Sequence, residues 1–485
     1  MVMSMSKAML SYFLAATLFV SGHAFAVDQN QANYVTYKDG LANLNDGQDL
    51  VLPLFSQRES YQGRIDLAMN PDNKQLDVMT FTLNEDSVGL TLLAAAADIA
   101  KRGGTPRIGF DAFSSKISPE LQAYMREKGV DLRSFRPLGF SKRNILAFFE
   151  LGVLGFAKFL NMRTHDKVYI TQHGTIVGSS NYSKYYYMLG KLENPNKVER
   201  HDMWSFLDRE VLIQGPAEQM AREKFNEKWA DTKSWSMGAP VKLTDEIRAK
   251  YDGLLAKQLQ FVNSVHNTKQ MKDFVSVTDL RYVTDDVGAK SKKKIIHHNL
   301  LNMIKNAKHD IVIENPYVLL PDDMMAALKL AKARGVRVRI YTNKAEGSDE
   351  GDVSKQFKID MRHLENTGFE VFLNDHFYIF HGKVVVVDHQ DVYWGSYNFD
   401  PRSKNFNSEN GVFFKSKEVA AQIISRTKTG IFVPIDIEGQ GSKSYVVKYL
   451  ARTCAEVYKK QRVETIHMET SMWSRLMMRM KQPLL

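Results

Sequence analysis

The sequence predicts an α/β protein made of two homologous lobes, each a mixed β-sheet flanked by helices, packed together as a pseudo-dimer. Three observations predict this fold. Strand-like and helix-like segments alternate in both halves of the chain. A set of short motifs occurs once in each half at a nearly constant offset. The length of 485 residues also fits two or three domains better than one.

In the first half, residues 76–83 have the composition of a strand, and residues 88–102 follow with helical periodicity. Gly103 and Gly104 end this helix, and residues 107–110 predict the next strand. The second half has the same succession: a strand at 311–314, an amphipathic helix at 322–334 and a strand at 336–342. Strands joined by helices predict parallel neighbours in a sheet.

The internal repeat is clearest further along each half. The first half contains HDKVYIT, TIVGSSN and DREVLIQG, and the second contains HGKVVVVD, VYWGSYN and ENGVFFKS. His165 and His381 are 216 positions apart, whereas Asp208 and Glu409 are 201 apart. The shorter second offset predicts an insertion in the first half, between Asn181 and Asp208.

The repeat and the flanking segments predict five parts along the chain. They are a signal peptide (1–26), a first lobe (27–235), a connecting helical segment (236–295), a second lobe (296–430) and a C-terminal helical tail (431–485).

The first residues have the pattern of an export signal. Lys7 is the only charge before Asp28, an apolar run spans 8–20, and small residues stand at Ala24 and Ala26. The run is shorter than the roughly 20 residues that a bilayer span needs, so a cleaved signal is favoured over a permanent anchor. We expect an exported protein, periplasmic or secreted, that can bind peripherally to a membrane.

Composition narrows the partners and excludes some chemistry. The formal net charge of +10 favours polyanions or an anionic membrane surface. Cys454 is the only cysteine, which excludes an intramolecular disulfide and a thiolate zinc site. We expect neither a cofactor nor a metal ion.

The second copy of the repeat shows which chemistry the motifs can perform. His381 and Lys383 are two residues apart, so on a strand both side chains project from the same face. Gly395 offers a place where the backbone can approach a ligand closely. Glu409 can accept a hydrogen bond from an imidazole and fix its tautomer.

Duplication of this set suits phosphoryl transfer. A phosphodiester needs attack on one side and protonation of the leaving oxygen on the other, and two histidines in opposite roles supply both. Lysines, asparagines and serines can hold the non-bridging oxygens. The two halves provide His165, Lys167, Ser179, Asn181 and Asp208, and His381, Lys383, Ser396, Asn398 and Glu409. A pseudo-twofold packing of the lobes would bring both sets together.

Residues 381–409 resemble the HKD motif region of the phospholipase D superfamily, and the chain is similar to bacterial cardiolipin synthases over about residues 45–430. The matching segments include NPYVLLPDDMMAALKLAKARGVRVRIYTN and GSYNFDPRSKNFNSENG. The resemblance implies a phosphohistidine intermediate on His165, with His381 as general acid and then base. It also implies that Asp388 completes the second motif and that Asp208 and Glu409 orient the imidazoles.

The first copy departs from this pattern, because Gln172 stands where the second copy has Asp388. A glutamine still donates and accepts hydrogen bonds, so a structural role of that position can survive. A degenerate, non-catalytic phospholipid-binding protein therefore remains an alternative to an enzyme.

Several segments favour a glycerophospholipid as the substrate. Residues 145–160, ILAFFELGVLGFAKFL, can lie in a membrane interface, although a buried helix explains them equally well. The end of the chain, SMWSRLMMRMKQPLL, has the pattern of a basic amphipathic helix. A nuclease of the same superfamily is the less favoured alternative, for which Tyr182 and the tyrosines at 185–187 would stack on bases. Headgroup, acceptor, hydrolysis versus transfer, and oligomeric state stay open.

Overall fold

The structure is a computed structural model. It describes residues 49–135, 159, 161–187, 206–232, 235, 240–265, 274–287, 294–343, 364, 367–374 and 379–428. The predicted signal peptide, nearly all of the apolar segment 145–160 and the tail lie outside these residues.

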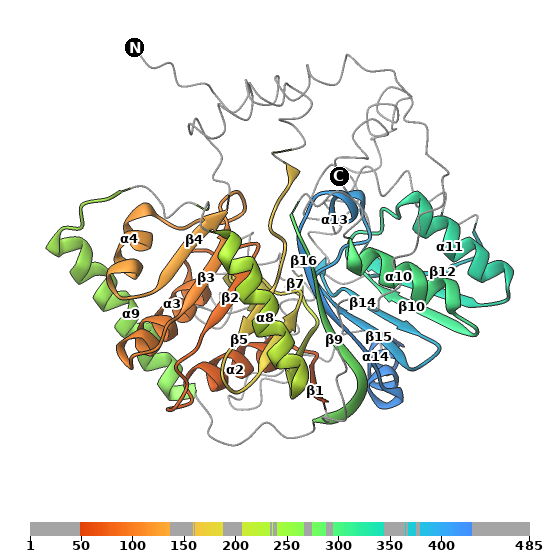
Figure 1. The fold of residues 1–485 in the computed structure, drawn as a ribbon, viewed down its shortest axis with the longest axis horizontal. Helices are drawn as coiled ribbons and strands as arrows, with labels where there is room; N and C mark the ends of the chain where they lie inside the picture. The colour runs from red at the N-terminus through yellow and green to blue at the C-terminus, as the bar shows by residue number, and fades with distance from the viewer. Residues whose placement is uncertain are drawn as a thin grey trace, which may run out of the picture.

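The first lobe alternates strands and helices as predicted (Figure 1). Its elements are β1 (Asp49–Leu54), α2 (Gln57–Ala68), β2 (Asp77–Thr80), α3 (Ser87–Lys101), β3 (Arg107–Asp111), α4 (Pro119–Glu127), β4 (Asp131–Phe135), β5 (Val168–Ile170), β6 (Thr175–Gly178), α6 (Lys184–Tyr187), β7 (Phe206–Leu207), β8 (Glu210–Gln214), α8 (Pro216–Asp231) and α9 (Asp245–Val265).

The described part of the second lobe repeats this succession of strands and helices. Its elements are β9 (Val275–Asp285), α10 (Ile295–Asn306), β10 (Asp310–Glu314), α11 (Asp322–Ala333), β11 (Arg337–Asn343), β12 (Glu370–Asn374), β13 (Ile379–Phe380), β14 (Val384–Val387), β15 (Asp391–Gly395), α13 (Pro401–Asn405), β16 (Glu409–Lys415) and α14 (Lys417–Lys428).

A mixed sheet runs through both lobes and shows their equivalence. Its order is β4-β3-β2-β5-β6-β8-β1 in the first lobe and β12-β11-β10-β14-β15-β16-β9 in the second. The two parallel pairs and the antiparallel pairs fall at the same places in both orders. The lobes join where β1 pairs with β9, with Val51 opposite Val275. The predicted α/β fold of two homologous lobes is confirmed.

Local sequence explains the predicted elements that the structure contains. Asp86 caps α3 by accepting from the backbone N–H groups of Val88 and Gly89. The helix ends at Gly103, whose φ of +83° favours glycine. Val384–Val387, buried on both faces, form the uninterrupted apolar strand typical of a sheet covered on two sides.

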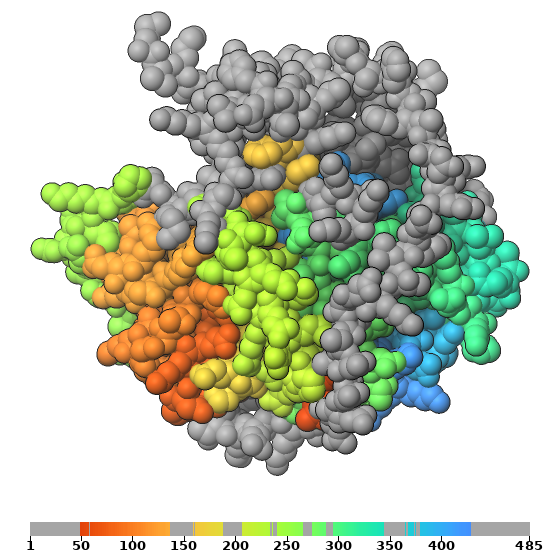
Figure 2. All heavy atoms as spheres, viewed as in Figure 1, coloured from red at the N-terminus to blue at the C-terminus, as the bar shows by residue number. Residues whose placement is uncertain are grey.

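Helices cover both faces of the sheet. The equivalent helices α8 and α14 pack on the face that is central to the molecule, in one apolar core shared by both lobes. On the other face, α3, α4 and α9 build the core of the first lobe, and α10 and α11 that of the second. In Figure 2 the yellow-green residues of α8 form the surface at the middle of the visible face.

The range predicted as a connecting segment, 236–295, contains elements of both lobes. Helix α9 packs against α3 of the first lobe, and β9 is the strand of the second lobe that pairs with β1. Among the helices of the described ranges, none combines the length and the apolar character that crossing a bilayer requires.

A buried ion pair also connects the lobes. Arg209, which precedes β8, donates from Nε to Glu314 at the end of β10 at 3.2 Å, and both side chains are almost fully buried. Its Nη1 donates to the carbonyl of Phe55 at 3.1 Å. Because the hydroxyl of Thr427 also bonds Glu314, the carboxylate is held from two elements.

We expect Arg209→Met to lower the free energy of unfolding by about 3–5 kcal/mol, because the substitution leaves the Glu314 carboxylate buried without its counter-charge. Urea denaturation followed by circular dichroism measures the loss.

The matched control is Arg337→Met, which removes an exposed pair with Glu370 at the sheet edge. This variant is expected to lose much less stability, since solvent screens an exposed pair. Equal losses in the two variants would contradict a role of Arg209 in joining the lobes.

Candidate functional site

The two histidines lie at the seam between the lobes, each just before a central strand. The strand β13, which leads to His381, pairs in parallel with β7, which leads to Asp208 in the other lobe. The His381 N–H donates to the carbonyl of Leu207 at 2.8 Å. Likewise, the His165 N–H donates to the carbonyl of Ser408 at 3.1 Å. Each histidine is therefore positioned by backbone of the opposite lobe.

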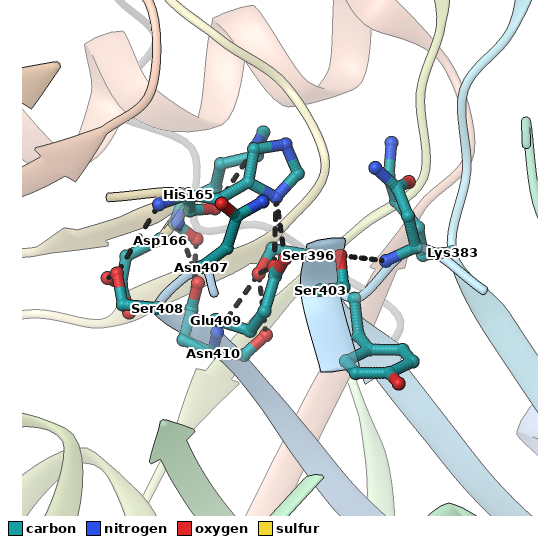
Figure 3. Close-up of polar contacts among 12 residues, drawn as sticks. His165, Asp166, Lys383, Ser396, Ser403, Asn407, Ser408, Glu409 and Asn410 are labelled. Atoms are coloured by element: carbon teal, nitrogen blue, oxygen red, sulfur yellow. Dashed lines mark hydrogen bonds and ion pairs between the residues drawn. The ribbon is translucent and has the colours of Figure 1, made fainter. Parts of the chain in front are cut away.

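The carboxylates that orient the imidazoles are also exchanged between lobes. Nδ1 of His165 lies 2.9 Å from Oε2 of Glu409, and Nδ1 of His381 lies 2.6 Å from Oδ1 of Asp208. Figure 3 shows the His165 ring above Glu409, joined by two dashed contacts. Since Nδ1 is used in both pairs, Nε2 is the ring nitrogen that can react.

The two lysines converge on the same site. Nζ of Lys167 donates to the carbonyl of His165 at 3.1 Å, and Nζ of Lys383 donates to that of His381 at 2.6 Å. Burial lowers the pKa of His165 well below its usual value, and the charges of Lys167 and Lys383 lower it further. Burial, Lys383 and Lys167 lower the pKa of His381 to about 3 in the same way. Each lysine thus acts across the seam on the histidine of the other lobe.

The two carboxylates differ in their surroundings. Both oxygens of Glu409 accept hydroxyl hydrogen bonds, from Ser396 and from Ser403. Burial nevertheless raises the pKa of Glu409 to about 7. Burial acts in the same direction on Asp208, but the charges of His381 and Lys383 overcome it and lower its pKa. The half-site of His381 therefore has the more strongly ionised carboxylate.

Aromatic rings border both histidines. Phe81 meets the His165 ring edge-on at 5.1 Å between centroids. Phe206, Tyr186 and Tyr317 surround the His381 ring at 5.1–6.3 Å. These rings keep the histidines in an apolar wall, which is consistent with their lowered pKa values.

Comparisons with known proteins show which family the chain is similar to. Residues 300–429 match the family model described as "Cardiolipin synthase, PLD-like domain". Cardiolipin synthase C of Escherichia coli is 25% identical over 433 residues, which cover 80% of this chain and 85% of that protein. A cardiolipin synthase of Geobacillus is 26% identical, over 74% of this chain and 62% of its own length.

The chain resembles the cardiolipin synthases of the phospholipase D superfamily. A solved structure, the phosphatidylserine synthase of Haemophilus influenzae, has the same fold, with a TM-score of 0.54 and 13% identity. It covers 78% of this chain, and 85% of its own chain is matched. The resemblance therefore includes both lobes of the phospholipase D-like fold.

The asparagines of the two motifs, Asn181 and Asn398, are both buried. Oδ1 of Asn181 accepts from the N–H of Thr82 at 3.1 Å, which leaves its amide N–H groups for a ligand. The backbone N–H of Asn398 donates to Ser403 at 3.2 Å, and its side-chain Oδ1 is buried without a hydrogen bond to a described residue.

The serines and Gly395 of the motifs make contacts within the fold, and phosphate binding by Ser179 and Ser396 stays a prediction. The Ser179 hydroxyl accepts from the N–H of Arg209 and donates to its carbonyl, at 3.1 and 3.2 Å. The Ser396 hydroxyl accepts from the N–H of Asn410 at 3.0 Å and donates its proton to Glu409. A side chain at Gly395 would clash with the carbonyl of Asn410, so this glycine admits the neighbouring strand rather than a ligand.

Asp388 does not belong to the catalytic group. It lies beyond the far end of β14 from His381, and its carboxylate accepts from the backbone N–H groups of Lys308, His309 and Asp310. In the first lobe, Gln172 accepts from the N–H of Lys74 at the same place before β2. The amide oxygen of Gln172 makes the backbone contact that the Asp388 carboxylate makes in the second lobe. The replacement of aspartate by glutamine therefore changes no contact of the two histidines.

Sequence reasoning did not identify Asp166 and Ser408. Asp166, between His165 and Lys167, is buried and accepts from Lys228, Thr284 and Ser408. The signal in the sequence is weak, because the equivalent position in the second lobe is Gly382.

The described residues contain no group of acidic, histidine or cysteine side chains that could hold a metal ion.

We expect Asp388→Ala to lower the free energy of unfolding by about 1–2 kcal/mol, because it leaves backbone N–H groups without their acceptor. The rate of any phosphodiester turnover should stay within about twofold of the wild type. Denaturation curves and turnover rates, measured on the same preparation, test both. A folded variant that turns over substrate about a hundred times more slowly would return Asp388 to the catalytic group.

Proposed function

We propose that the protein cleaves the phosphodiester of glycerophospholipids through a phosphohistidine intermediate, and transfers the phosphatidyl group to an alcohol or to water. The observation that carries the proposal is the exchange of carboxylates across the seam. Each of the two buried imidazoles has Nδ1 bonded to an acid of the other lobe, and the charges of both lysines act on both imidazoles.

In the first step, Nε2 of His165 attacks phosphorus and the bond to the leaving alcohol oxygen breaks. Protonated His381 gives its proton to that oxygen. In the second step, neutral His381 takes a proton from the incoming alcohol or water, whose oxygen then displaces His165 from phosphorus. Lys167, Lys383, Asn181 and Asn398 hold the non-bridging oxygens and stabilise their charge.

The unequal half-sites support His165 as the nucleophile. Burial and the charges of Lys167, Lys383 and Arg402 lower the pKa of its imidazole, which keeps it neutral and ready to attack. The pKa of His381 is also lowered, to about 3, but Asp208 opposes this shift. The negative charge of a bound phosphodiester would act in the same direction as Asp208 and favour the protonated imidazole that a general acid requires.

Three further observations support a phospholipid substrate and a location outside the cytoplasm. The relatives named above are cardiolipin and phosphatidylserine synthases. The net charge of +10 suits an anionic membrane surface. The signal-like pattern of residues 1–26 supports export to the periplasm or beyond.

Incubation of the purified chain with phosphatidylglycerol, phosphatidylethanolamine and single-stranded DNA, with products identified by mass spectrometry, tests the substrate class. We expect phospholipid products whose amount does not change with a chelator, and no cleavage of DNA. Products from DNA alone would indicate a nuclease, and no products at all would indicate a binding protein.

A phosphodiester with an activated leaving group, such as p-nitrophenol, separates the roles of the histidines. His381→Ala should release one equivalent of p-nitrophenol and retain the phosphoryl group, because this leaving group needs no general acid. His165→Ala should lower turnover by about 10³-fold or more and retain no phosphoryl group. Mass spectrometry of the peptide that carries the phosphoryl group locates the adduct. An adduct on His381 in His165→Ala would reverse the assignment.

The pH profile of kcat/KM should show a maximum between about pH 7 and 8. Below about pH 7, the Glu409 carboxylate binds a proton and loses the negative charge that accepts the hydrogen bond from Nδ1 of His165. Burial lowers the pKa of Lys167 to about 8, so above that pH it loses the charge that holds phosphate. Glu409→Gln should lower the rate and remove the acidic limb, and persistence of that limb would contradict its assignment to Glu409.

A further inference from the structure

Arg402 borders the site, and its side chain forms no ion pair with a described residue, although its charge acts on the buried carboxyl of Asp400. It belongs to α13, and its Nε is buried without a hydrogen-bond partner in the described part of the chain. Other arginines near the seam have counter-charges: Arg163 pairs with Asp111 at 2.8 Å and Arg209 with Glu314 at 3.2 Å. A buried donor that lacks an acceptor costs free energy unless a ligand satisfies it.

The backbone around Arg402 is fixed to the His165 half-site. Its carbonyl accepts from the N–H groups of Phe406 and Asn407, at 2.8 and 3.0 Å. The next residue, Ser403, donates its hydroxyl to Glu409 at 2.6 Å, and Glu409 bonds His165. The segment that carries Arg402 is therefore tied, through Ser403 and Glu409, to the proposed nucleophile.

Two further unsatisfied atoms lie in the same segment. Oδ1 of Asn398 and Oδ1 of Asn407 are buried without a hydrogen bond to a described residue. Figure 3 shows the Asn407 side chain beside the His165 ring. A rotation of either amide by 180° would exchange Oδ1 for Nδ2, which could donate to an oxyanion. The guanidinium can donate two parallel N–H groups to an oxyanion.

The electrostatic effect of Arg402 is directed to one half-site. Its charge contributes to the lowered pKa values of His165 and Arg163, and it opposes the rise that burial causes in the pKa of Asp400. Counting four residues on from the motif asparagine gives Arg402 after Asn398 and Tyr185 after Asn181, so the first lobe has no arginine at this position. The additional cation thus belongs to the side of the site from which His165 attacks.

We propose that Arg402 is a third cation that binds the transferred phosphate, and that it stabilises the phosphoryl group while that group is attached to His165. The guanidinium would donate to non-bridging oxygens that Lys167 and Lys383 do not neutralise. This inference rests on the proposed function for the identity of the covalent step, but the binding of phosphate by Arg402 can be measured without turnover.

The binding test uses inorganic phosphate as the probe and isothermal titration calorimetry on the full chain. We expect Arg402→Gln to weaken phosphate binding at least about tenfold. Arg402→Lys should weaken it less, because lysine keeps the positive charge but lacks the planar pair of N–H donors. Lys404→Gln is the matched control, since Lys404 lies on the same helix but pairs with Asp323 at 2.8 Å. Equal affinity in Arg402→Gln and Lys404→Gln would overturn the proposal.

Stability without phosphate separates ligand binding from a structural role. Arg402→Gln removes a cation that forms no ion pair with a described residue, so its melting temperature should stay close to that of the wild type. A lowered melting temperature together with unchanged phosphate affinity would show that Arg402 acts on the fold alone.

Turnover then distinguishes this proposal from the proposed function. With the p-nitrophenyl substrate, Arg402→Gln in the His381→Ala background should reduce the yield of the His165 adduct about tenfold or more. If the wild type has no turnover but Arg402→Gln weakens phosphate binding, the function fails and this inference stands. If turnover and adduct yield are unaffected by Arg402→Gln, the inference fails and the function stands.

Discussion

The site depends on the exchange of histidine–carboxylate pairs between the lobes. Each imidazole receives its Nδ1 partner from the other half of the chain, His165 from Glu409 and His381 from Asp208. Neither lobe can orient its own histidine, so the reactive geometry exists only where the lobes meet. This requirement explains why the two halves share one sheet, one apolar core beneath α8 and α14, and the buried Arg209–Glu314 pair.

The symmetric frame supports an asymmetric site. Strand order, pairing sense and the contacts of the lysines agree between lobes, whereas the groups around each histidine do not. Glu409 is held by two serine hydroxyls, but Oδ2 of Asp208 is buried without a partner among the described residues. Two-step phosphoryl transfer needs one imidazole that attacks and one that moves protons, so unequal surroundings suit the chemistry better than full symmetry.

Much of the fold and of the candidate site could be predicted from the sequence. Periodicity located strands such as β10 and β11 and helices such as α3 and α11, because local burial determines these patterns. The repeat identified both histidines, both lysines and both acids. It did not show that Asp388 lies at the far end of β14 from His381, since a motif records which residues recur together and not which of them lie side by side.

By itself, the sequence determined the two-lobe α/β architecture and the chemical groups available to the site, because periodicity and internal repetition are properties of the chain. Only the tertiary structure decided how those groups combine. It crossed the carboxylates between lobes, placed Asp388 at the far end of β14 and buried Asp166 between lobes. The physical reason is that these contacts join residues up to 244 positions apart, whose distance depends on the packing of the whole sheet.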